Sequence, residues 1–157
     1  MRVWSNQLLP PRIDNAYRGY KLALWLFGLL LLIKLAMSLN SIFNSYAVAT
    51  VADGIPLDTY GPAAACTIVS LFALLGLSHF VICLLGIVAL FRYRSMIPLL
   101  YALLLVEHLS RRVILHFIPI VRIGTPPGFY VNLILLAVIT AGLALSLTGK
   151  EKEDAPN

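Results

Sequence analysis

The sequence predicts an all-α integral membrane protein, a four-helix bundle with its N and C termini in the cytoplasm. Three observations support this fold class. The 157-residue chain is 60% hydrophobic and only 12% charged, whereas a soluble domain carries about a quarter charged residues. Four apolar segments are each long enough to cross a hydrocarbon core about 30 Å thick. The basic residues gather at the ends of these segments that share one side of the membrane.

The four apolar segments account for nearly the whole chain. We expect spans at about residues 22–51, 64–91, 97–118 and 129–148. They leave little room for a soluble domain, so residues 1–150 are interpreted as a single four-span transmembrane domain. The tail 151–157, EKEDAPN, is short and polar, which is typical of disorder.

The connections between the spans have the composition of turns. The segment ADGIPLDTYGP separates spans one and two, and IGTPPGFY separates spans three and four. Both are rich in glycine and proline, which favour bends. The connection FRYRSM between spans two and three is short. Before the first span, aromatic residues alternate with polar ones, which favours either a segment lying in the membrane interface or a partly ordered tail.

The placement of charge predicts the orientation. The basic residues of one side are Arg2, Arg12, Arg18, Lys21, Arg92, Arg94, Lys150 and Lys152. The connection between spans one and two has two aspartates and no basic residue, and the connection between spans three and four has only Arg122. The positive-inside rule therefore places both termini in the cytoplasm. This distribution accounts for the net charge of +5 without nucleic acid as a partner. Size and the absence of a targeting signal favour a bacterial inner (plasma) membrane.

The third span contains the unusual chemistry, within the stretch LLVEHLSRRVILHF. An arginine at the centre of a membrane helix costs about 2.5–3.5 kcal/mol, whereas a leucine returns only about 0.3–0.6 kcal/mol. Glu107 and Arg111 are four residues apart and can pair on one face. His108 and Arg112 repeat that spacing, so the four side chains cover an arc of about 140°. We expect this arc to face the bundle rather than lipid.

Other spans carry polar residues at matching depths. Lys34 begins a polar stripe with Ser38, Ser41 and Ser45 on span one, and His79 lies among small residues on span two. At 1.5 Å per residue, Lys34, His79, Glu107 and His108 all lie about 17–20 Å from the cytoplasmic ends of their helices. The predicted ligand-binding residues are therefore Lys34, Asn40, His79, Glu107, His108, Arg111, Arg112 and Asn132.

The excess of basic groups over Glu107 suggests a function. One carboxylate cannot neutralise Lys34, Arg111 and Arg112 together, and a small anionic or amphipathic ligand, or a lipid headgroup, would relieve that excess. We therefore expect a protein that binds or transports such a ligand. The simpler interpretation is a buried ion pair that sets helix register, in an accessory or scaffold subunit of a larger membrane complex. Outward extension of Arg112 to lipid phosphates would reduce the excess.

A third interpretation is a redox protein with b-type haem between His79 and His108, and a proton relay through Glu107 and the two histidines is a further alternative. The sequence has no phosphate-binding loop or nucleophile elbow, no paired catalytic carboxylates and no spaced metal ligands. We therefore expect no catalytic residues, no metal site and no cofactor. The expected partners are the lipid bilayer, a small anionic ligand or lipid, and a second copy or a membrane-complex subunit.

Overall fold

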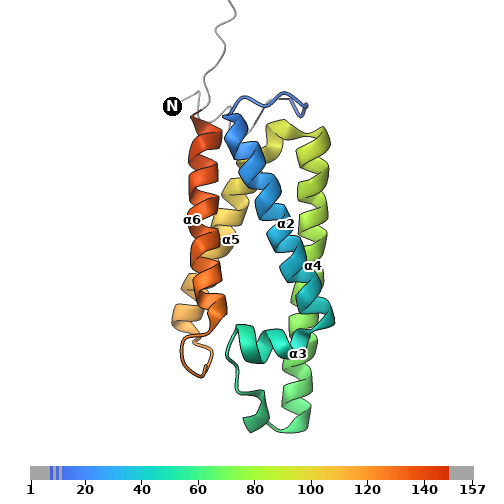
Figure 1. The fold of residues 1–157 in the computed structure, drawn as a ribbon, viewed down its shortest axis with the longest axis vertical. Helices are drawn as coiled ribbons and strands as arrows, with labels where there is room; N and C mark the ends of the chain where they lie inside the picture. The colour runs from blue at the N-terminus through green and yellow to red at the C-terminus, as the bar shows by residue number, and fades with distance from the viewer. Residues whose placement is uncertain (1–7, 9, 11, 149–157) are drawn as a thin grey trace, which may run out of the picture.

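A computed structural model describes residues 8, 10 and 12–148, and this part of the chain contains helices and no strands. Four long helices run roughly side by side (Figure 1). They are α2 (Lys21–Phe43), α4 (Pro62–Arg92), α5 (Ile97–Phe117) and α6 (Pro127–Leu147). Shorter helical segments connect them: α3 (Ser45–Ala47), the π-helix η1 (Val48–Ala52), and the 3-10 helices η2 (Leu57–Thr59) and η3 (Arg94–Met96). The predicted disordered tail 151–157 lies outside the described residues.

Three of the long helices, α2, α4 and α6, are long and apolar enough to cross a membrane. Helix α5 is as long as α6, with 21 residues, but contains Glu107, Arg111 and Arg112. Its length and composition alone therefore do not qualify it as a span. The helix lies against α6 and shares a core with it.

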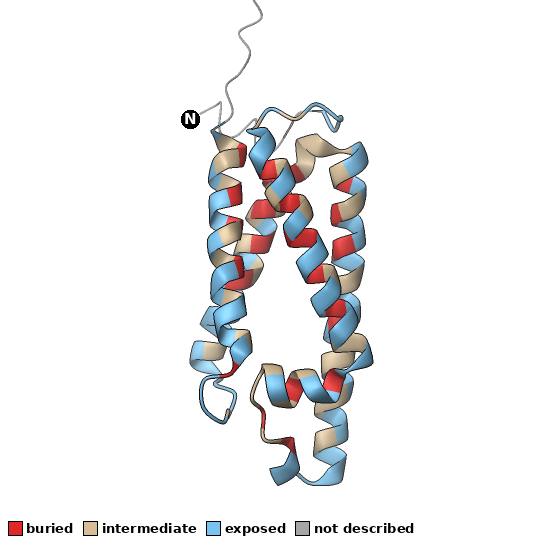
Figure 2. Cartoon of the chain, viewed as in Figure 1, coloured by how far each residue is buried: buried red, intermediate tan, exposed pale blue. Residues whose placement is uncertain are grey.

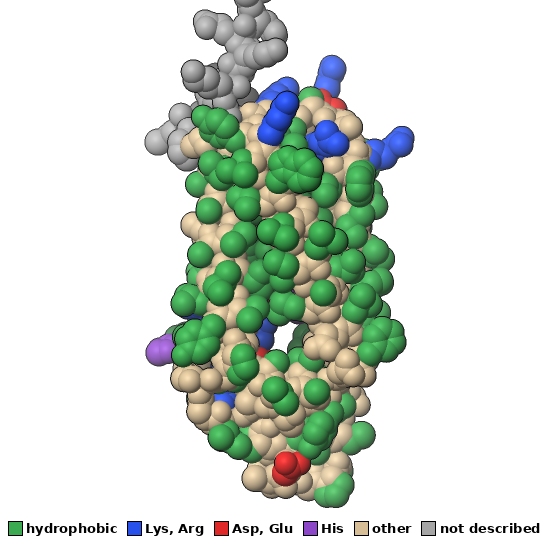
Figure 3. All heavy atoms as spheres, in the orientation of Figure 1, with side chains coloured by type: hydrophobic (Ala, Val, Ile, Leu, Met, Phe, Trp, Pro, Cys, Tyr) green, Lys and Arg blue, Asp and Glu red, His purple; other side chains and the backbone are tan. Residues whose placement is uncertain are grey.

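The outward faces of these helices are apolar. Trp25, Leu32 and Leu85 have exposed fractions of 79%, 65% and 63%. Buried residues form stripes that face the neighbouring helices, and the remaining helix surface is exposed (Figure 2). Hydrophobic side chains cover most of the visible surface between the two ends of the molecule (Figure 3). A surface of this kind suits contact with lipid.

Close packing of α2 on α4 depends on small residues. The buried residues of α4 are Gly76, Cys83, Gly86 and Ala89. A Cβ atom at Gly76 would lie 2.7 Å from Ser41 Cβ and 3.0 Å from the Ser38 carbonyl oxygen of α2. A Cβ atom at Gly86 would press on the side chain of Leu31. The small residues around His79 thus bring the two helix backbones together, as small residues do between membrane helices.

A second contact joins α2, α5 and α6. Tyr101 of α5 is fully buried, and its hydroxyl donates a hydrogen bond to the Ala23 carbonyl of α2 at 2.9 Å. Its ring packs edge-on to Phe27, with 5.1 Å between centroids, and lies against Gly142 of α6. The buried phenol is therefore both packed and hydrogen-bonded.

Helix α2 ends at Phe43, whereas the sequence pattern predicts a span continuing to residue 51. Asn44 leaves the helical conformation, with φ −126° and ψ 39°, and its side chain donates to Asn40 Oδ1 at 2.9 Å. Such local side-chain hydrogen bonds compete with the helix. The chain then turns, and α3 runs across the molecule below the end of α2, beside the lower part of α4 (Figure 1). At the far side, the Ala52 carbonyl lies so close to Gly128 that a Cβ atom there would overlap it.

The segment before α2 crosses the opposite end of the molecule. Asp14 and Ser95 exchange hydrogen bonds, and the Tyr17 hydroxyl donates to Ser146 Oγ at 3.2 Å. Burial raises the pKa of the Tyr17 phenol. A pocket of about 320 Å³ at this end is lined by Arg12, Tyr17 and other residues, and includes none of the eight predicted ligand-binding residues.

The close approach at Gly76 gives a stability prediction. Gly76→Ala should lower the free energy of unfolding by about 1–3 kcal/mol relative to Gly28→Ala, because the added methyl group overlaps α2. Gly28 is the matched control: it is also inside a helix, so it gains the same helix propensity, and its Cβ would meet only Leu90 at 3.6 Å. Thermal unfolding in one detergent measures both. Equal stability of the two variants would contradict the packing.

Candidate functional site: the Glu107 cluster

Glu107 of α5 lies at the centre of a polar cluster formed by three helices. Its Oε2 atom accepts a hydrogen bond from Lys34 Nζ of α2 at 3.1 Å. Its Oε1 atom lies 3.2 Å from His79 Nε2 of α4. We refer to Lys34, His79, Glu107 and His108 as the Glu107 cluster. The two oxygens of a single carboxylate therefore connect α5 to both α2 and α4.

Lys34 is the most deeply placed cation of the cluster. Its side chain is 9% exposed, and the carboxylate of Glu107 compensates its charge. Ser38, one turn further along α2, is also buried but donates to the Leu35 carbonyl of its own helix at 2.8 Å. Of these two residues in the predicted polar stripe, Lys34 is therefore the one that contacts α5.

His79 is held at both ring nitrogens. Nδ1 lies 2.8 Å from the Leu75 carbonyl oxygen, one turn earlier in α4, and Nε2 faces Glu107. The Leu75 contact fixes the ring so that Nε2 projects from α4 towards α5. Iron ligation through this nitrogen would have to displace Glu107.

His108 is next to Glu107 in α5 and is also buried, with a side chain 8% exposed. Its Nδ1 atom lies 3.1 Å from the Leu104 carbonyl oxygen and 3.7 Å from Glu107 Oε2. Both histidines are therefore beside the same carboxylate. The four side chains predicted to share one depth are the four that the structure brings together.

The arginines of α5 have different surroundings. Arg111 Nη2 lies 3.9 Å from Asp53 Oδ2, and its side chain is 45% exposed. The predicted partner of Arg111 was Glu107; in the structure Glu107 pairs with Lys34 and His79 instead, since its carboxylate points towards α2 and α4. Arg112 is exposed.

The two predicted asparagines do not join the cluster. Asn40 is exposed, and its Oδ1 accepts a hydrogen bond from Asn44. Asn132 Nδ2 donates to the Gly128 carbonyl of its own helix at 2.8 Å. From their positions in the sequence, both asparagines were expected at about the depth of Arg111 and Arg112, but each side chain forms its hydrogen bond with a nearby residue.

Asp53 is the residue near the site that sequence reasoning missed. It follows η1 directly, and its side chain is only 15% exposed. The sequence pattern assigned it to a bend, although the predicted excess of positive charge in span three required a nearby anion. At the same end, Asp58 of η2 accepts a hydrogen bond from the Tyr46 hydroxyl at 2.7 Å, and this bond and the aspartate charge raise the pKa of the Tyr46 phenol.

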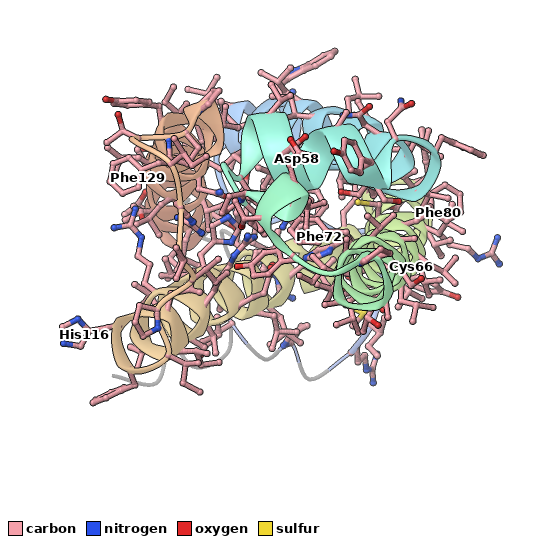
Figure 4. All side chains as sticks on the ribbon, turned by 90° about the horizontal axis from the view of Figure 1, so that it is seen from below. Asp58, Cys66, Phe72, Phe80, His116 and Phe129 are labelled. Atoms are coloured by element: carbon pink, nitrogen blue, oxygen red, sulfur yellow. The ribbon has the colours of Figure 1, made fainter. Side chains whose placement is uncertain are left out.

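The space-filling view shows an opening between the helices, above α3, with charged side chains at its edge (Figure 3). Seen from below, nitrogen-bearing side chains gather in the middle of the molecule (Figure 4). His116, by contrast, points away from it (Figure 4).

Comparisons with protein-family models, with curated proteins and with solved structures find no match. Within residues 12–148, no three side chains of His, Cys, Asp or Glu are grouped to hold a metal ion.

A double-mutant cycle tests the central ion pair. Glu107→Gln should lower the free energy of unfolding by about 1–3 kcal/mol, because it leaves Lys34 as a buried charge without its counter-ion. The effect is smaller than the roughly 3–5 kcal/mol of a fully buried pair, since the Glu107 side chain is 34% exposed. Adding Lys34→Met to Glu107→Gln should recover part of this loss.

Chemical unfolding in detergent gives the four free energies of this cycle. Arg112→Gln, on the exposed part of the same helix, is the control and should change stability by less than about 0.5 kcal/mol. Strictly additive effects of the Lys34 and Glu107 substitutions would show that the two side chains do not interact.

Proposed function

We propose that the protein is a four-span integral membrane protein, cytoplasmic at both termini, that binds or transports a small anionic or amphipathic ligand at the Glu107 cluster. The proposed location is a bacterial inner membrane. The observation that carries the proposal is the group of one lysine and two histidines around a single carboxylate, among helices whose outer faces are apolar.

The contacts of α5 support its assignment as a membrane span alongside α2, α4 and α6. Its carboxylate faces α2 and α4, and Arg111 faces Asp53. Its apolar side chains point outwards instead: Leu103, Val106 and Val113 are each more than half exposed. Ionisable residues in membrane helices usually face the bundle in this way. Contacts with other polar groups inside the bundle then offset the free-energy cost of placing them in the membrane.

The distribution of charge supports the proposed orientation. Lysines and arginines gather at one end of the space-filling view (Figure 3). Arg12, Arg18 and Arg94 belong to the segments at this end, whereas Asp53 and Asp58 belong to the other. The positive-inside rule then places the basic end in the cytoplasm.

The balance of charge supports an anion as the ligand. Glu107 pairs with Lys34, and Asp53 pairs with Arg111. The excess of positive charge is therefore smaller than the sequence alone suggested. Protonation of either histidine would add positive charge that no described carboxylate matches. The exposed apolar faces of the surrounding helices suit a ligand with an apolar part.

Native mass spectrometry of the protein in mild detergent tests ligand binding. We expect a discrete bound mass on the wild-type protein and its loss in Lys34→Met, because Lys34 is the buried cation of the cluster. Lys21→Met is the matched control, because this lysine is exposed at the start of α2. A bare monomer, or a bound mass that both variants retain, would contradict the site. A co-purifying protein chain would favour an accessory subunit.

Cysteine labelling tests the proposed orientation. In a chain with Cys66 and Cys83 replaced, a cysteine at Asp58 should react in intact cells with a thiol reagent that cannot cross the membrane. A cysteine at Lys150 should react only after the membrane is opened. The reverse pattern would overturn the orientation and leave the ligand site unaffected.

A further inference from the structure

We infer that the ligand of the Glu107 cluster is the singly charged anion of a weak acid, bound together with one proton that His79 and Glu107 share. This inference rests on the proposed function and adds the class of ligand and its coupling to protons. The geometry of His79 carries it.

The hydrogen-bond partners of His79 fix where its protons lie. A backbone carbonyl can only accept a hydrogen bond, so the 2.8 Å contact with Leu75 places a hydrogen on Nδ1. A neutral ring would then present the lone pair of Nε2 to Glu107 Oε1 at 3.2 Å. Two acceptors at that distance repel each other. The contact is attractive only when a proton lies between Nε2 and the carboxylate.

Lys34 determines which partner carries that proton. Its ammonium group donates to the second carboxylate oxygen at 3.1 Å and stabilises the ionised form of Glu107. The shared proton therefore resides on His79. The three groups then consist of two cations and one anion, with a net charge of +1.

The surrounding groups leave this charge in place. On α5, Arg111 is matched by Asp53 at 3.9 Å, and His108 directs Nδ1 to the Leu104 carbonyl, which a neutral ring can do. On α4, Cys83 is a free thiol, and on α6 the buried residues Leu135, Ile139, Gly142 and Ser146 are all uncharged. The cluster with its proton is thus positively charged among apolar helices, which is unfavourable without a counter-ion.

Two events relieve that charge: the proton leaves His79, or a monovalent anion binds. The two events are therefore coupled. An anion beside Lys34 and His79 makes retention of the proton more favourable, and the proton makes binding of the anion more favourable. A singly charged anion brings the cluster to neutrality, whereas a dianion would leave it negative. The anion and its proton together are equivalent to the neutral weak acid, and the only bond formed is the N–H bond of His79 as it takes up that proton.

Octanoate is a suitable probe because it joins one carboxylate to an apolar chain. The full chain in lipid nanodiscs is titrated with octanoate by calorimetry in pairs of buffers that differ in ionisation enthalpy, which gives the number of protons taken up. We expect uptake to approach about one proton per octanoate as pH rises from about 6 to about 9. Affinity should then fall by up to about tenfold per pH unit.

His79→Gln should bind octanoate more weakly and without proton uptake. His116→Gln should behave like the wild type, because His116 points away from the molecule (Figure 4). Octanoate binding without proton uptake, or with uptake that survives in His79→Gln, would overturn this inference and leave the proposed function standing. If His79→Gln does not fold, a wild-type affinity that is flat from about pH 6 to about pH 9 decides against the inference. No octanoate binding would contradict both proposals.

Discussion

The placement of one carboxylate in an apolar helix is the constraint on which the other features of the site depend. Glu107 is stable in α5 only where cations can reach both of its oxygens, and these cations come from two other helices. The rotation of α5 about its axis is set accordingly, and its leucines and valines are left on the outer surface. Lys34 and His79 are constrained in turn, because each lies in a helix whose remaining surface is mostly apolar. The cluster therefore determines how three helices face one another.

Close packing makes those distances attainable. Gly76 and Gly86 let α4 approach α2 near the level of His79, and Gly142 lets α6 approach the ring of Tyr101. The hydrogen bond from Tyr101 to Ala23 joins α5 to α2 roughly two turns from Glu107. This bond fixes the two helices relative to each other near the carboxylate. Beyond the cluster, the turn at Asn44 sends α3 and η1 across the end of the helices and brings Asp53 to Arg111. The charged groups are thereby separated into two neighbouring pairs, Lys34 with Glu107 and Arg111 with Asp53.

The depth of each residue along its helix could be predicted from the sequence, whereas the partner that each side chain contacts could not. Lys34, His79, Glu107 and His108 share a level because every helix rises 1.5 Å per residue from ends marked by charge and proline, and the structure brings these four side chains together. The direction of each side chain is a separate matter. Glu107 and Arg111 share a face by spacing, but they turn to partners on different segments. Asp53 comes within reach of Arg111 only because α2 ends early, and that end depends on one non-helical residue, Asn44, within a long apolar pattern. Asn40 and Asn132 had the right depth, but Asn40 accepts a hydrogen bond from the neighbouring Asn44, and Asn132 donates one to the Gly128 carbonyl of its own helix.

The burial of Lys34, the proton on His79 and the attraction of an anion all depend on the ionisation of Glu107. Infrared spectroscopy of the protein in lipid observes this directly, as the difference between the wild type and Glu107→Gln. Ionised carboxylates and protonated carboxylic acids absorb in separate regions. The account predicts that the wild type contributes the antisymmetric stretch of a carboxylate at neutral pH, and that this band disappears in the variant. A carbonyl band of a protonated acid in its place would contradict the account, because Lys34 would then have no counter-ion in Glu107.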